Sequence, residues 1–309
     1  MRSAFALWSG FIIVTVFMKL ILTIFLIAFG SFVRADDSPL DVWPDLAPGE
    51  TTRSTGEKKP SPAKQDPPIT LMTKVTQPTF TVHAAEDPNG AGVVILPGGG
   101  FSRVVPDLEG SEAAAFLNRI GVTVFVLSYR TKNSPDESGW EKPLQDAQRT
   151  LAIVRSRAAE WKLDKDKIGL LGFSAGGNVA ARLLSAEGVL AYESVDDIDS
   201  TPHRPDFSIL IYPWSIYDAE KDSLIDGVSV PESCPPTFIV HTDDDKSSSL
   251  GSVLFYAGLK KFGIPAELHV YGNGGHGYGV RPRESSEISS WPGHAAHWLS
   301  RWVEQQSQK

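Results

Sequence analysis

The sequence predicts an α/β fold, in which a mostly parallel central sheet carries helices on both faces. Short apolar runs alternate with helix-like segments along the chain, a rhythm typical of parallel sheets built from strand–helix–strand units. The 309 residues, 41% of them hydrophobic, suffice for the core of one large domain. Strands are expected at residues 79–83, 93–96, 123–127, 168–171, 206–211, 237–241 and 266–271.

Residues 1–35 have the pattern of an export signal. The stretch 11–29 is almost wholly apolar, and small side chains near Ala35 suit signal peptidase. Met18 and Lys19 begin a shorter stretch with the same basic, apolar and cleavage parts, so translation could start at Met18. We expect cleavage after Ala35 and a secreted or periplasmic bacterial protein. The alternative is an uncleaved membrane anchor, because the apolar run is long enough to span a bilayer.

Residues 36–68 are rich in Pro, Lys, Asp, Ser and Thr, so we expect an extended polar arm from which Trp43 could dock on the body. Residues 69–309 would then form the α/β domain. The only cysteine, Cys234, excludes an internal disulfide. The net charge of -8 without a basic cluster argues against nucleic-acid binding. No convincing metal-ligand spacing or dinucleotide fingerprint is present.

The first chemical feature of the domain is a run of glycines after the expected strand 93–96. A backbone without Cβ atoms can bring amides against a developing negative charge, so Gly99 and Gly100 are interpreted as oxyanion donors. The alternatives are an ordinary glycine loop and a phosphate-binding loop. No lysine follows, as a phosphate-binding loop would require.

The sequence GFSAG at residues 172–176 lies between an apolar run and a helix-like segment. Small neighbours on both sides of Ser174 let a strand turn sharply into a helix and lift the serine hydroxyl out of the sheet. The same turn puts the amide of Ala175 at a helix N-terminus, where it can donate to an oxyanion. The pattern predicts a nucleophile elbow; the alternative is a phosphate-binding or plain turn with an incidental serine.

The late strands 237–241 and 266–271 each run into a polar loop. The first loop contains three consecutive acids, residues 243–245, and the second contains His276 among glycines. A serine hydroxyl becomes a good nucleophile when an imidazole takes its proton and a carboxylate orients that imidazole. We therefore expect a triad of Ser174, one of the three acids and His276. His241 is a competing base, but its position at a strand end favours a buried, hydrogen-bonded side chain.

Several of these segments carry a resemblance to a known family. Between Gly92 and Gly279 the chain resembles secreted bacterial α/β-hydrolases of the acetylxylan esterase and feruloyl esterase kind, a branch labelled xylanase-associated or dienelactone-hydrolase-like. In that family the catalytic acid is the fourth residue after the histidine that closes the preceding strand, which implies Asp245. The resemblance rests on residues 96–101, 126–130, 144–161, 167–177, 241–245 and 274–277.

The chain departs from the family pattern in two places. Many relatives have a histidine where this chain has Pro97, and proline cannot donate the hydrogen bonds that would brace the glycine loop. Relatives carry apolar residues and proline after the catalytic acid, whereas residues 246–249 here are Lys-Ser-Ser-Ser. Neither change removes a catalytic atom, but both bear on the shape of the substrate site.

Together these features predict a secreted serine carboxylesterase that removes acetyl or similar small acyl groups from carbohydrate such as acetylxylan, with no cofactor and no metal. Phe101 and Trp214 could stack on sugar rings or simply pack in the wall. The alternatives are a serine peptidase of the same fold acting on small peptides, and a non-catalytic binding protein. Glycosidase activity is rejected, because no pair of carboxylates has motif support. Membrane contact is expected only through an uncleaved leader, and no oligomeric state is predicted.

Overall fold

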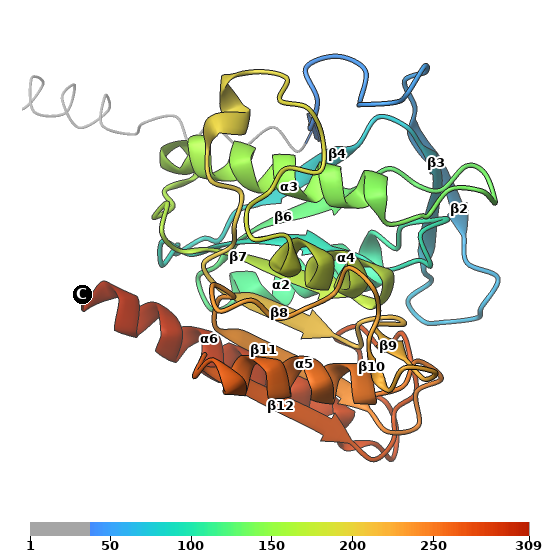
Figure 1. The fold of residues 1–309 in the computed structure, drawn as a ribbon, viewed down its shortest axis with the longest axis vertical. Coiled ribbons are helices and arrows are strands. Elements are labelled where there is room, and N and C mark those ends of the chain that lie inside the picture. The colour runs from blue at the N-terminus through green and yellow to red at the C-terminus, as the bar shows by residue number, and fades with distance from the viewer. Residues whose placement is uncertain (1–37, 309) are drawn as a thin grey trace, which may run out of the picture. The chain divides into compact units, whose positions relative to one another are not determined.

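The computed structural model describes residues 38–308, which form an eight-stranded central sheet with helices on both faces (Figure 1). At one edge the two outermost pairs of neighbouring strands are antiparallel, and all other neighbouring pairs in this sheet are parallel. This confirms the mostly parallel α/β sheet that the sequence predicts. In spatial order the strands are β1 (Leu40–Asp41), β4 (Thr79–His83), β6 (Thr123–Ser128), β5 (Gly92–Leu96), β7 (Ile168–Phe173), β8 (Ser208–Ile211), β11 (Thr237–Thr242) and β12 (Ala266–Tyr271).

Two apolar clusters sandwich this sheet. Along β5, Val94 and Leu96 belong to one cluster and Val93 and Ile95 to the other, because successive side chains of a strand point to opposite faces. Both faces are therefore buried, which explains why the central strands are apolar throughout. One face is covered by α3 (Glu141–Ser156), α4 (Ser174–Ser185) and α5 (Leu250–Lys261), and the other by α2 (Glu112–Asn118) and α6 (Trp291–Ser307).

Shorter elements complete the described chain. Two small antiparallel pairs join β2 with β3 and β9 with β10. No helix among residues 38–308 is long and apolar enough to cross a membrane. The expected export signal, residues 1–35, lies outside the described residues. The remaining elements are β2 (Thr55–Pro60), β3 (Thr70–Val75), η1 (Asp107–Ser111), η2 (Ala158–Trp161), η3 (Asp197–Ser200), β9 (Tyr217–Asp218), β10 (Ser223–Leu224) and η4 (Glu287–Ser290).

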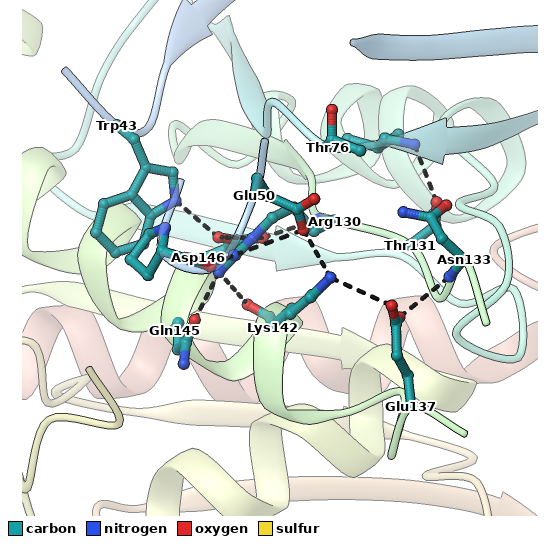
Figure 2. Close-up of polar contacts among 12 residues, drawn as sticks. Trp43, Glu50, Thr76, Arg130, Thr131, Asn133, Glu137, Lys142, Gln145 and Asp146 are labelled. Atoms are coloured by element: carbon teal, nitrogen blue, oxygen red, sulfur yellow. Dashed lines mark hydrogen bonds and ion pairs between the residues drawn. The ribbon is translucent and has the colours of Figure 1, made fainter. Parts of the chain in front are cut away.

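The segment expected as an extended polar arm is built into the body over its described part, residues 38–68. β1 adds an edge strand to the sheet by pairing with β4. Val42 and Trp43 are buried, and the indole N–H of Trp43 donates to Asp146 at 2.8 Å (Figure 2). The described part is therefore not simply an extended arm, whereas Trp43 docks on the body as the sequence suggested. The few apolar side chains of the segment are buried at a site on the body that the composition of the segment does not identify.

That site contains a buried ionic network around Arg130 (Figure 2). The guanidinium of Arg130 pairs with Asp146, with 2.9 Å between Nε and Oδ1, and also donates to Gln145. Lys142 pairs with Glu50 at 2.7 Å, so a residue of the expected arm takes part in the network. The guanidinium of Arg130 lies 5.7 Å from the ring centre of Trp43. Charge pairing and packing thus fasten residues 43–50 to the start of α3.

Candidate active site

The turn from β7 into α4 has the geometry of a nucleophile elbow. β7 ends at Phe173 and α4 begins at Ser174, whose φ of 51° lies in the left-handed region that non-glycine residues rarely adopt. A Cβ atom on Gly172 would lie 2.5 Å from the carbonyl oxygen of Gly176, and one on Gly176 would lie 2.0 Å from that of Leu96. Glycine is therefore required on both sides, and the strained turn holds Ser174 at the carboxyl edge of the sheet.

The structure brings Ser174, His276 and Asp245 together from three different loops. The Oγ atom of Ser174 lies 2.7 Å from Nε2 of His276, and Nδ1 of His276 lies 2.6 Å from Oδ2 of Asp245. An ionised carboxylate only accepts hydrogen bonds, so Nδ1 carries a proton that it donates to Asp245. In the neutral ring Nε2 then offers a lone pair, to which the Ser174 hydroxyl donates. This arrangement suits transfer of the serine proton to the imidazole.

Asp245 is held by more than His276. Its Oδ1 accepts from the backbone N–H of Ser247 at 2.9 Å, and its Oδ2 lies 3.2 Å from Nε2 of His241. Burial opposes ionisation, but the hydrogen bonds from His241, His276 and Ser247 outweigh it and lower the pKa of Asp245 below its ordinary value of 3.8. The carboxylate therefore stays ionised and can balance positive charge on His276.

His241 lies behind the acid, as a buried and hydrogen-bonded residue. Its Nε2 is 2.8 Å from the carbonyl oxygen of Ser247, which can only accept, so Nε2 carries the proton. Its Nδ1 lies 2.8 Å from the hydroxyl of Ser252 and accepts from it. Both ring nitrogens are thus occupied, and the only imidazole within hydrogen-bonding distance of Ser174 among residues 38–308 is that of His276.

The glycine loop after β5 lies against Ser174. A Cβ on Gly98 would be 2.7 Å from Cβ of Ser174, and one on Gly99 would be 2.2 Å from the carbonyl oxygen of Arg103. Gly100 has a φ of 62°. Within residues 38–308, the backbone N–H groups of Gly99, Gly100 and Ala175 meet no hydrogen-bond acceptor. These are the amides that the sequence nominates as oxyanion donors, and all are free to donate.

Comparison with known proteins agrees with this geometry. The BD-FAE family model matches residues 89–194. The structure of an acetyl ester-xyloside bifunctional hydrolase from Caldicellulosiruptor lactoaceticus is 26% identical, covers 86% of this chain and 96% of its own, and superposes with a TM-score of 0.67. This chain has the α/β-hydrolase fold. The resemblance to the acetylxylan and feruloyl esterase branch that the sequence indicates is confirmed.

This chain is also similar to two curated proteins. It is 28% identical over 218 residues to an acetylxylan esterase of Xylanibacter ruminicola, covering 63% of this chain and 42% of that protein. It is 29% identical over 228 residues to endo-1,4-beta-xylanase B of Butyrivibrio fibrisolvens, covering 65% of this chain and 34% of that protein. The chain thus spans less than half the length of either relative. A sugar hydrolase from Lactococcus lactis shares the fold at 23% identity and a TM-score of 0.60.

The two aromatic residues expected at the substrate side differ in their contacts. The ring of Trp214 lies 5.0 Å from that of His276, and its backbone N–H donates to the carbonyl of Ser174 at 2.9 Å. Trp214 therefore borders the triad of the hydrolase. Phe101 follows the oxyanion glycines and packs on Gly139, where a Cβ would lie 2.9 Å from that of Phe101. Phe101 thus forms part of the wall beside the glycine loop.

The loop that carries His276 is fastened by residues whose role the sequence did not reveal. Asp244, one of the three acids considered for the triad, accepts from the backbone N–H groups of Gly274 at 3.2 Å and Gly275 at 2.7 Å. Arg283 donates to the carbonyl oxygens of Gly274 at 2.6 Å and His276 at 3.0 Å. No motif surrounds Arg283, so only the fold identifies it. Among residues 38–308 no cluster of side chains suits a metal ion.

Proposed function

We propose that this hydrolase is a serine carboxylesterase that removes acetyl or similar small acyl groups from carbohydrate such as acetylxylan. The observation that carries the proposal is the hydrogen-bonded series of Ser174, His276 and Asp245, with distances of 2.7 and 2.6 Å, beside unpaired backbone amides. The acetylxylan esterase among the relatives and the acetyl ester-xyloside hydrolase among the structures support the substrate class.

The reaction follows from these positions. His276 takes the proton of Ser174 as Oγ attacks the ester carbonyl carbon, and the oxygen that becomes negative accepts hydrogen bonds from Gly99, Gly100 and Ala175. The tetrahedral intermediate collapses, the sugar oxygen departs with the proton of His276, and an acyl-enzyme remains. Water, activated by His276, then releases the carboxylic acid and restores Ser174. Asp245 orients His276 and balances its charge in both steps.

The direct test measures hydrolysis of p-nitrophenyl acetate and of acetylated xylan by the full-length protein. We expect activity on both, and loss of both in Ser174→Ala. Ser185→Ala is the matched control, because Ser185 lies at the far end of the same helix, where its hydroxyl donates to Ala181 and Ser229. Activity on neither ester, or cleavage of small peptides instead, would contradict the proposal.

We also propose that the protein acts outside the cytoplasm. The apolar stretch and the small residues near Ala35 support this, and they are independent of the site. N-terminal sequencing of the protein recovered from culture medium or periplasm should begin at Asp36. An N-terminus upstream of Lys19 would contradict cleavage of the signal.

A further inference from the structure

A buried acid lies directly behind the glycine loop. Glu109, in η1, is 3% exposed and forms no ion pair with any Lys or Arg among residues 38–308. Its Oε2 accepts from the backbone N–H of Gly98 at 2.7 Å, and its Oε1 accepts from the hydroxyl of Tyr212 at 2.9 Å. Burial raises the pKa of Glu109, although the hydrogen bonds from Tyr212 and Gly98 act in the opposite direction.

Tyr212 extends this contact to the loop of the catalytic histidine. It follows β8, is fully buried, and has a φ of 38°, a strained value for a tyrosine. Its hydroxyl donates to Glu109 and accepts from the backbone N–H of Gly279 at 2.9 Å. Its ring centre lies 4.8 Å from that of His276. A continuous series of hydrogen bonds therefore joins the amide of Gly98 to the amide of Gly279.

The amide that Glu109 fixes is adjacent to the proposed oxyanion donors. The carbonyl of Gly98 accepts from Val105 N–H at 3.1 Å. Because C=O and N–H of a trans peptide point in opposite directions, this bond sets the direction of the Gly99 N–H. A Cβ on Gly98 would lie 2.5 Å from Oε2 of Glu109, so the loop is packed tightly against the acid. Glu109 thus holds the Pro97–Gly98 peptide plane, which is the neighbour of the plane that carries the Gly99 N–H.

We infer that Glu109 and Tyr212 are positioning residues that fix the oxyanion loop and the histidine loop relative to each other. The inference rests on the proposed serine mechanism and adds two side chains to it. Neither side chain touches the reacting atoms. Glu109 acts through the Gly98 amide, and Tyr212 acts through Gly279 and through packing on His276. Both loops must be in place together, because in one transition state negative charge forms at the oxyanion loop and positive charge forms on His276.

The test compares Tyr212→Phe and Glu109→Gln with the wild type. Tyr212→Phe removes one hydroxyl without changing the ring, and Glu109→Gln keeps the shape while placing an N–H₂ opposite one of two donors. We expect kcat to fall about 10- to 100-fold with little change in KM, as for a small misplacement of catalytic groups. Affinity for a boronic acid that forms a tetrahedral adduct with Ser174 should fall by a similar factor.

A matched pair of controls lies elsewhere in the fold. Tyr192 donates to Asp199 at 2.7 Å, and Asp199 accepts from the backbone N–H of Val195 at 2.7 Å, so a tyrosine, a carboxylate and an amide also meet away from Ser174, although Asp199 pairs with Arg149 as well. Tyr192→Phe and Asp199→Asn should lower the melting temperature while leaving kcat per titrated active site unchanged. A melting-temperature loss in Tyr212→Phe similar to that in Tyr192→Phe, with kcat unchanged, would reduce the pair to a structural contact and overturn the inference.

A second readout separates this inference from the choice of substrate. The rate at which an organophosphate such as paraoxon phosphorylates Ser174 also depends on the oxyanion loop and the histidine, but requires no carbohydrate. We expect Tyr212→Phe to slow this labelling about tenfold or more, and Tyr192→Phe to leave it unchanged. If the wild type is labelled and Tyr212→Phe is labelled equally fast, the inference is overturned but the serine mechanism is not. An unlabelled wild type would overturn the serine mechanism and the inference with it.

Discussion

Two buried polar clusters in this hydrolase balance charge in different ways. In the arginine cluster, defined by Trp43, Arg130, Asp146, Arg149 and Asp199, each carboxylate faces a guanidinium. Nε of Arg130 lies 2.9 Å from Oδ1 of Asp146, and Nη1 of Arg149 lies 2.7 Å from Oδ1 of Asp199. The charges in this cluster are already paired in the resting protein, so the cluster serves to hold residues 43–50 and α3 together.

The catalytic cluster, defined by Ser174, His276, Asp245, Glu109 and Tyr212, has no such pairing. Among residues 38–308, neither of its carboxyl groups pairs with a Lys or Arg, and both accept from neutral donors. Within the described part of the chain, the backbone N–H groups of Gly99, Gly100 and Ala175 also lack a hydrogen-bond acceptor. The unpaired groups of such a site gain charged partners only when charge separates during the reaction. The comparison predicts that substitutions in the arginine cluster reduce stability, and that substitutions in the catalytic cluster reduce rate.

The largest effect is expected from Ser174→Ala. Removing the nucleophile of a serine triad costs about 10⁶-fold in kcat, and the residual rate comes from binding and the oxyanion hole. The hydroxyl bonds only to His276 among the described residues, and the strained φ is unchanged, so the melting temperature should stay close to that of the wild type. Steady-state kinetics and thermal unfolding measured on the same samples test this. A large fall in stability would show that the site also holds the fold together.

Asp245→Asn should have the next largest effect on rate. An amide can present N–H₂ to Nδ1 of His276 and so favour the wrong tautomer, which costs about 10⁴-fold in kcat with the geometry intact. Tautomers can be followed by ¹⁵N chemical shifts of the His276 ring. Persistence of the Nδ1–H form with normal kcat would contradict the role of Asp245 as orienter.

The same substitution also predicts how stability depends on pH. The pKa of Asp245 is lowered in the folded protein, so the carboxylate adds stability above its ordinary value of 3.8, and this stability is lost as the pH falls toward the folded value. Asp245→Asn should therefore be less stable than the wild type at neutral pH. The difference should shrink below pH ~4. Denaturant midpoints across this range measure it, and a deficit that grows on acidification would contradict the direction of the shift.

Arg130→Met should lower stability and leave kcat unchanged, the opposite of what is expected for Ser174→Ala. It leaves Asp146 as a buried charge without its cation, which costs about 3–5 kcal/mol of unfolding free energy. Urea unfolding measures the loss, and kcat per titrated active site should match the wild type. The double variant Arg130→Met, Asp146→Leu is the control, because replacing both partners removes the unpaired charge and should recover part of the stability. A selective loss of kcat would mean that the arginine cluster is coupled to the triad.

The sequence was informative where the chemistry is encoded in neighbouring residues. The elbow at Ser174 and the glycine-rich loop at His276 are short motifs, so their meeting at one site could be predicted, and the alternation of strands and helices predicted the fold class. Two long-range contacts have partners that the sequence did not predict, although the docking of Trp43 itself was expected. Trp43 bonds to Asp146 and Tyr212 to Glu109, each across 103 residues. Contacts of this kind depend on how the sheet is assembled, and no local pattern marks them.

The smallest effect tests whether burial, and not ion pairing as such, makes the arginine cluster important. Arg157 and Glu160 lie just beyond the end of α3, Glu160 within η2, with Nη2 and Oε2 2.7 Å apart and side chains 37% and 55% exposed. Exposed pairs contribute about 0.2–1 kcal/mol, because water screens them and two long side chains lose freedom. Glu160→Gln should therefore change the urea midpoint only slightly, and added salt should reduce even that difference. Arg157 would still pack on the ring of Trp161, 4.8 Å away. A loss of stability as large as that of Arg130→Met would mean that an ion pair stabilises the protein equally well when it is exposed. The contrast between the two clusters would then need another cause.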